Sequence, residues 1–75
     1  MQISQLINKG SKILRMKNIK SHLLDTELIL SEIMNMSREK VLISDDEKVS
    51  KKNISIFKKL IKRRLNHEPI AYILK

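Results

Sequence analysis

The fold of this chain is decided by residues 22–35, which read HLLDTELILSEIMN. On a helical wheel of about 100° per residue, the apolar side chains of this segment point in nearly every direction. A helix of that kind is covered by neighbouring helices, whereas a surface helix carries a single apolar stripe. We therefore expect a central helix over residues 22–35, and its apolar side chains are Leu23, Leu24, Leu28, Ile29, Leu30, Ile33 and Met34.

The rest of the chain also has helical spacing and few residues that break helices. It contains one Gly, one Pro and no alternating run of β-branched residues that would indicate a strand. Ser37 and Ser50 stand where side-chain caps begin helices, and Gly10 on an apolar helix side indicates close approach of a neighbour. The sequence predicts an all-α fold, a small bundle of four to five helices in one domain (1–75), at about residues 2–16, 22–35, 38–44, 51–66 and 69–74.

Composition limits the class of protein. Apolar residues make up 41% of the chain, and with one Phe, one Tyr and no Trp the core must be largely aliphatic. The absence of cysteine excludes disulfides and thiolate metal sites, and it fits a reducing compartment. The first residues lack a secretory signal, and no apolar run reaches the roughly 18 residues of a membrane span. We expect a cytoplasmic protein with no membrane partner.

Positive charge is concentrated in the last third of the chain. The net charge is +8, and residues 51–75 contain eight Lys and Arg residues against a single acidic residue, Glu68. In the helix predicted over residues 51–66, apolar and basic side chains fall on opposite sides. The basic side chains form a candidate partner-contact face, which consists of Lys51, Lys58, Lys59, Lys62 and Arg63.

Three other roles for this basic side stay open. Lysine-rich helix sides are often simply solvated, and they also bind anionic membranes or the phosphates of nucleic acids. The membrane is the weakest alternative, because the apolar side of the same helix is needed to cover residues 22–35. Nucleic acid is less favoured as a partner than protein, because no aromatic stacking platform accompanies the lysines.

Arg64 breaks this division, because the wheel places it among the apolar side chains. Asp25 and Glu27 lie on the helix predicted to be buried, where each carboxylate needs a partner. We predict a structural ion pair between Arg64 and these carboxylates, Asp25 first and Glu27 second. We prefer this interpretation to acid–base chemistry, because structural ion pairs are the commoner role of such carboxylates.

No residues in the chain form a catalytic or metal-binding set. His22 and His67 are 45 positions apart, and neither has a nucleophile or a carboxylate arranged around it in the sequence. We interpret both as surface or capping residues. The chain is therefore predicted to contain no catalytic, cofactor-binding or metal-binding residue.

The residues after the basic helix indicate a junction. Asn66 is expected to supply the left-handed residue that ends this helix. Pro69 cannot continue the helix but suits the first turn of a new one, with Glu68 as the acidic residue in front. The apolar run that follows needs a covering structure, so we interpret Glu68, Pro69, Ile70 and Tyr72 as an interdomain junction.

Two segments carry a resemblance to a known family. The first, residues 24–30, reads LDTELIL, and the second consists of Arg63-Arg64 followed by EPIAYIL at residues 68–74. In this register they resemble the amino-terminal domain of the HemK family, the release-factor glutamine N5-methyltransferases, over about residues 19–75. The family usually has glycine at His67 and Lys75. Its catalytic Asn-Pro-Pro-Tyr motif and its Gly-rich S-adenosylmethionine loop do not occur in this chain.

The resemblance implies a helical substrate-recognition domain that precedes a Rossmann-like catalytic domain, which is missing here. The parent enzyme would transfer a methyl group from S-adenosylmethionine to the Gln of the Gly-Gly-Gln motif of a peptide chain release factor. This domain would dock the factor and contact its own catalytic domain, without doing chemistry. The alternative is a free-standing basic helical module that binds nucleic acid or another anionic surface.

Overall fold

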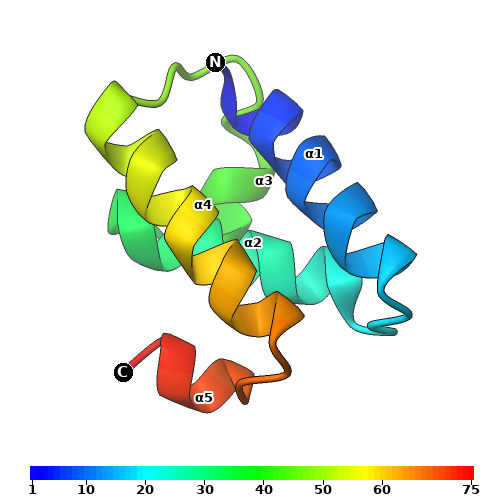
Figure 1. Cartoon of the computed structure of the whole chain (residues 1–75). Helices are drawn as coiled ribbons and strands as arrows, with labels where there is room; N and C mark the ends of the chain where they lie inside the picture. Colours follow the sequence, from blue (N-terminus) through cyan, green and yellow to red (C-terminus); the bar gives the residue numbers. More distant parts are fainter.

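The computed structural model describes all 75 residues and contains five helices and no sheet (Figure 1). This confirms the predicted all-α bundle, and no predicted helix end lies more than two residues from the observed one. The helices are α1 (Ile3–Met16), α2 (His22–Met34), α3 (Arg38–Leu42), α4 (Lys51–Leu65) and α5 (Ile70–Ile73).

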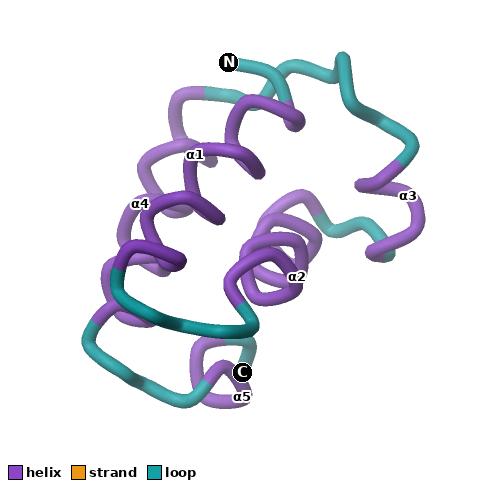
Figure 2. The backbone as a smooth tube through the Cα atoms, turned by 90° about the vertical axis from the view of Figure 1, so that its right-hand side faces the viewer, coloured by secondary structure: helices purple, strands orange, loops and turns teal.

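The helices form two layers. Helices α1 and α4 lie side by side in one layer, and α2 crosses behind both of them (Figures 1 and 2). Helix α2 contacts α1, α3 and α4, and its contacts with α1 are the most extensive in the molecule. The short helix α5 follows α4 at the other end of the bundle from the N-terminus (Figure 1). The central position predicted for residues 22–35 is therefore confirmed.

The core is aliphatic apart from Phe57, and it lies where α1, α2 and α4 meet. One expectation is wrong at the start of α2, where Leu23 and Leu24 are 48% and 43% exposed. In this turn the inward positions belong to Asp25, Thr26 and Glu27, which are all buried. The two leucines face outward. The side of α2 that its neighbours cover is occupied by Asp25, which pairs with Arg64 of α4, and by Glu27, which pairs with Arg38 of α3.

Gly10 allows α1 to approach both of its neighbours. A methyl group built on this residue would lie 2.8 Å from Phe57 Cζ of α4 and 2.8 Å from Thr26 Cγ2 of α2. Real side chains do not tolerate such distances, so only glycine fits without a shift of the neighbours. The close approach expected from the sequence is confirmed.

The predicted caps of α3 and α4 are present. Ser37 Oγ accepts a hydrogen bond from the Lys40 amide, and Ser50 Oγ accepts one from the Asn53 amide, both at 3.1 Å. These bonds satisfy amides that have no partner within the helix. Both helices therefore begin where the sequence places their caps.

The end of α4 differs from the expectation. The left-handed residue is His67, with φ of 64°, whereas Asn66 has φ of −83°. The Asn66 amide still donates to the Lys62 carbonyl at 3.2 Å, so helical bonding continues through Asn66 and the chain reverses one residue later. The Glu68 amide then donates to the Arg63 carbonyl at 3.3 Å, which is the pattern of a left-handed helix cap.

The N-terminus is tied to the connection between α3 and α4. The Ile3 amide donates to the Glu47 carbonyl at 2.9 Å, and the Val49 amide donates to the Met1 carbonyl at 2.9 Å. The first bond satisfies a free amide at the start of α1, and the two bonds together hold the loop that leads into α4 against the N-terminus. None of the helices has the length and apolar character required to traverse a lipid bilayer.

Candidate protein-docking site

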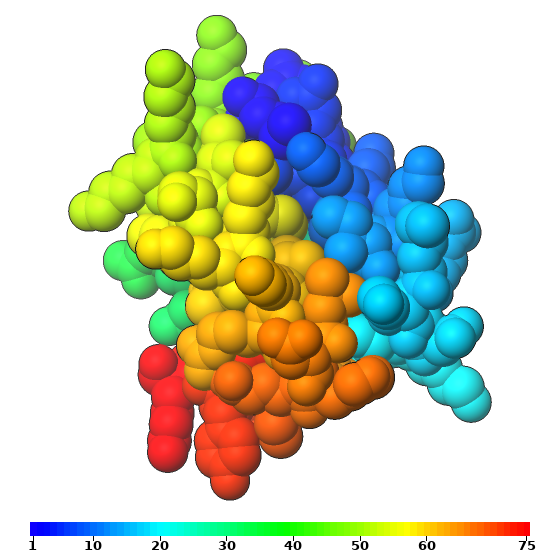
Figure 3. Space-filling model, viewed as in Figure 1, coloured from blue at the N-terminus to red at the C-terminus, as the bar shows by residue number.

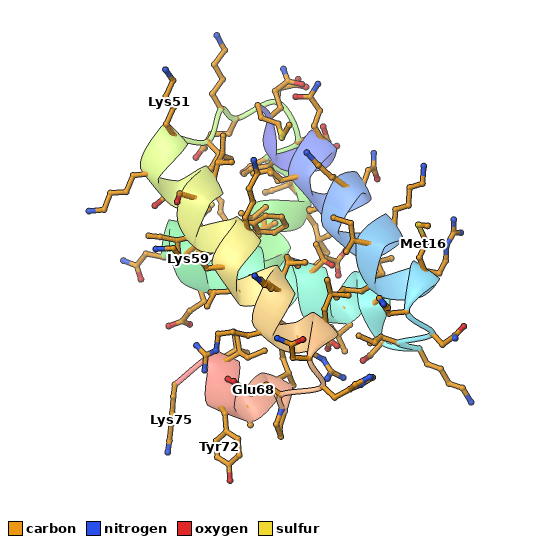
Figure 4. The ribbon with its side chains drawn as sticks, in the orientation of Figure 1. Met16, Lys51, Lys59, Glu68, Tyr72 and Lys75 are labelled. Carbon is orange, nitrogen blue, oxygen red and sulfur yellow. The ribbon has the colours of Figure 1, made fainter.

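The partner-contact face lies on the outer side of α4, and all five of its residues are exposed. Lys51 and Lys59 extend away from the bundle (Figure 4). Of the three ion pairs in the molecule, only one involves this face, and it joins Arg63 to Glu68. The four lysines of the face therefore form no ion pair.

The inner side of α4 packs against the rest of the bundle. Phe57 and Ile61 are buried in the core, and Arg64 lies on the same side of the helix. The side chain of Arg64 is 19% exposed, and that of its partner Asp25 is 3% exposed. The helix thus separates a charged outer side from an inner side that holds a single, paired charge.

Arg64 and Asp25 join the end of α4 to the start of α2. Arg64 Nε donates to Asp25 Oδ2 at 2.9 Å, and Ser21 Oγ donates to the same oxygen at 2.8 Å. Arg64 Nη1 also donates to the Glu68 carbonyl at 3.2 Å. The structure therefore brings together Arg64 and Asp25, the first carboxylate that the sequence suggested for it, and extends the network into the turn before α5.

Glu27 is not a partner of Arg64, which corrects the second part of that prediction. Arg38 Nε donates to Glu27 Oε1 at 2.9 Å and joins α3 to α2. The reason is the left-handed residue Asn35, with φ of 54°, which ends α2 and lets α3 fold back against it. The position of Arg38, one residue after the cap Ser37, was the only signal in the sequence for this pair.

The junction residues are arranged differently from the expectation for a helix cap. The Glu68 carboxylate binds Arg63 and does not cap α5, whose first residue is Ile70. Pro69 precedes the helix in an extended conformation, with ψ of 138°, because the left-handed residue before Glu68 has already turned the chain. Tyr72 is 59% exposed and points away from the bundle beside Lys75, whose ammonium lies 5.5 Å from the ring centre (Figure 4).

The two histidines lie in different surroundings. His67 is exposed at the end of α4, whereas His22 is half-buried and its Nδ1 lies 2.6 Å from Ser11 Oγ. This hydrogen bond links α2 to α1, a structural role that was not predicted for His22. No group of three or more His, Asp or Glu side chains could hold a metal ion.

Comparisons with known proteins find relatives of nearly the whole chain. The family model for the PrmC N-terminal domain matches residues 5–74. A bifunctional methyltransferase of Rickettsia felis is 40% identical over 72 residues, and one of Rickettsia typhi is 38% identical over 71. A release factor glutamine methyltransferase of Leptospira interrogans is 28% identical over 71 residues.

These matches cover nearly all of this chain but a small part of each relative. The aligned residues make up 96% of this chain in the match to the Rickettsia felis protein and 95% in the other two matches. They make up only 14% of each of the two Rickettsia proteins and 25% of the Leptospira interrogans protein. No solved structure matches the chain. The family model covers both segments that resemble the HemK family, and the helices that carry them form the predicted bundle. The chain therefore belongs to the PrmC N-terminal domain family, the amino-terminal domain of HemK-type methyltransferases.

Proposed function

We propose that this chain is the substrate-docking domain of a peptide chain release factor glutamine N5-methyltransferase. The parent enzyme would methylate the Gln of the Gly-Gly-Gln motif with S-adenosylmethionine. Family membership supports the proposal, as does the relative named release factor glutamine methyltransferase. The chain would act as a single helical domain that presents the factor to a separate catalytic domain.

The observation that carries the docking role is the uncompensated positive charge on the outer side of α4. All five basic residues of the partner-contact face are exposed, and only Arg63 has an acidic partner. Charges of one sign on a surface attract a partner of opposite sign, accelerate the encounter and orient it. The face therefore suits an acidic region of a protein substrate.

The residues of this chain suit docking better than chemistry. Asp25 and Glu27 are buried and bound to arginines, so neither is free to act as a general base. Gly10, the one glycine, is enclosed within α1 and cannot form a Gly-rich loop around a nucleotide. S-adenosylmethionine would supply the methyl group from the catalytic domain, and Glu68, Pro69, Ile70 and Tyr72 would form the junction to that domain.

A binding measurement with a purified release factor tests this proposal. We expect saturable binding to the chain that weakens as salt is raised, because exposed charges are screened. The Lys59→Glu/Lys62→Glu variant should bind at least about tenfold more weakly, since two attractions become repulsions. The control variant Lys17→Glu/Lys20→Glu carries the same charge change outside the partner-contact face and should bind like the wild type.

Two results would contradict the docking role. One is the absence of binding to any release factor under conditions where the chain is folded by circular dichroism. The other is tight, salt-sensitive binding of duplex DNA or RNA without binding of the factor, which would favour the free-standing basic module.

A further inference from the structure

An apolar groove of about 400 Å³ runs between α1 and α4 on the face shown in Figure 3. Its floor contains Leu6, Phe57 and Ile61, which belong to the core, and its more exposed walls are Ile13 and Leu65. Helices α1 and α4 contact each other much less than either contacts α2. The groove is the space that the side chains of α1 and α4 leave unfilled between the two helices.

Lysines from both helices line the edges of the groove. They are Lys9 on α1 and Lys58 and Lys62 on α4. The exposed lining is nevertheless almost entirely apolar, so these lysines contribute their methylene stems to the walls and hold their ammonium groups at the rim. None of the three forms an ion pair, and the groove contains no acidic side chain.

The apolar floor of the groove and the lysines along both of its edges limit the kind of partner that can bind there. A second copy of the chain would bring together two molecules that each carry a net charge of +8, so self-association is opposed by repulsion. A bilayer presents a broad surface to protruding side chains, whereas the apolar atoms here are recessed between two helices. An amphipathic helix fits both features, because its apolar side enters such grooves and acidic flanks would meet the lysines on either rim.

We propose that the groove binds an acidic amphipathic helix of a protein partner. The α4 wall extends from Phe57 to Leu65, about 12 Å at 1.5 Å per residue, which corresponds to two turns of a bound helix. Apolar side chains at positions i, i+3, i+4 and i+7 would enter the groove, and Asp or Glu beside them would pair with Lys9, Lys58 and Lys62. The inference rests on the proposed function only for the identity of the protein that carries this helix, the methylation substrate.

The test uses a stapled 14-residue helical peptide with Leu at i, i+3, i+4 and i+7 and Glu at the flanking positions. Titration into the chain, followed by nuclear magnetic resonance, should shift the methyl signals of Ile13 and Leu65 saturably. The Lys9→Glu/Lys58→Glu variant should bind at least about tenfold more weakly, as two rim attractions become repulsions. The matched control Lys12→Glu/Lys52→Glu changes one exposed lysine on each of the same helices outside the groove and should bind within about twofold of the wild type.

Several results would overturn the proposal. Equal losses in the two variants would mean that net charge, and not the groove, attracts the peptide. Equal binding of a peptide with Lys in place of Glu would mean that the rim has no role. Phosphatidylserine vesicles that shift the same methyl signals more strongly than the peptide would identify a membrane as the occupant. If Lys9→Glu/Lys58→Glu does not fold, Lys9→Ala/Lys58→Ala replaces it.

Variants that change the groove alone or the partner-contact face alone separate this inference from the proposed function. Lys9 lines the groove but is not part of the face, whereas Lys51 and Lys59 belong to the face but do not line the groove. If Lys9→Glu binds a release factor like the wild type while Lys51→Glu/Lys59→Glu binds it more weakly, the docking role stands and the groove proposal fails for that partner. If no release factor binds while the acidic peptide does, the docking role fails and the chemistry of the groove stands.

Discussion

Arg63 and Arg64 are neighbours in sequence but point to different sides of α4. Arg63 is 44% exposed and pairs with Glu68, which lies in the turn after the same helix. Arg64 is 19% exposed and pairs across the bundle with Asp25, which is 3% exposed. A step of one residue around the helix thus separates a surface charge from a charge that joins two helices. We therefore expect burial and a partner on another helix, and not the number of charges, to decide which basic residues stabilise the fold.

The largest expected effect is that of Arg64→Ala. It would leave the buried carboxylate of Asp25 without its charged partner, which typically costs about 3–5 kcal/mol. A domain of this size has little stability to spare, so the variant should be largely unfolded. Arg63→Ala removes an exposed pair, worth at most about 1 kcal/mol. Urea denaturation followed by circular dichroism compares the two variants.

A double-mutant cycle identifies the cause of this effect. If Arg64 acts through Asp25, the Asp25→Asn/Arg64→Ala variant should be more stable than the sum of the two single losses predicts. Small and equal effects of Arg63→Ala and Arg64→Ala would remove the distinction between the two sides of α4.

Gly10→Ala tests the contact between α1 and Phe57, which lies on the inner side of α4. The added methyl would meet Phe57 and Thr26 at 2.8 Å, and overpacking of this kind costs about 1–3 kcal/mol. The gain in helix propensity, about 1 kcal/mol, opposes this cost. We expect a net loss of stability in thermal denaturation, whereas Asn8→Ala, at an exposed position of α1, should be neutral or slightly stabilising. A higher melting temperature for Gly10→Ala would show that the three helices are not in tight contact.

His67→Gly should increase the free energy of unfolding, by less than Gly10→Ala is expected to lower it. His67 has φ of 64°, and a residue other than glycine in this region carries a conformational cost of about 1 kcal/mol or more. Glycine removes that cost, so the midpoint of urea denaturation should rise. The matched variant Asn66→Gly, at φ of −83°, should lower the midpoint, because the residue there has ordinary helical bonding. The reverse order would place the chain reversal at Asn66.

The smallest expected effect on stability is that of Lys59→Glu/Lys62→Glu. Both side chains are exposed and neither forms an ion pair, so the free energy of unfolding should change by less than about 0.5 kcal/mol per substitution. Urea denaturation under the conditions used for Arg64→Ala provides the comparison. A large loss would mean that the outer side of α4 contributes to the fold.

The parts of the molecule that depend on local sequence could be predicted. The five helices follow from apolar spacing, and Ser37 and Ser50 begin helices because their caps involve residues only three positions away. Arg64 could be singled out because a charge among apolar side chains requires a partner. Gly10 was informative for a similar reason. Glycine within a helix lowers helix stability, so its presence indicates that a neighbouring helix needs the space of the missing side chain.

The parts that depend on how the helices are placed could not be predicted. The Glu27–Arg38 pair requires the chain reversal at Asn35, and the sequence does not reveal the direction that α3 takes afterwards. The exposure of Leu23 and Leu24 also depends on which neighbours cover each turn of α2. The groove was missed for the same reason, because its lining comes from both α1 and α4 and depends on how the two helices are placed.

Mapping a release factor onto the isotope-labelled chain by nuclear magnetic resonance tests the central claim most directly. The account predicts that the factor shifts the amide signals of Lys58, Lys59, Lys62 and Arg63, while those of the buried residues of α2 keep their positions. Shifts confined to the exposed residues Leu23 and Leu24 of α2 would contradict a docking role for the outer side of α4.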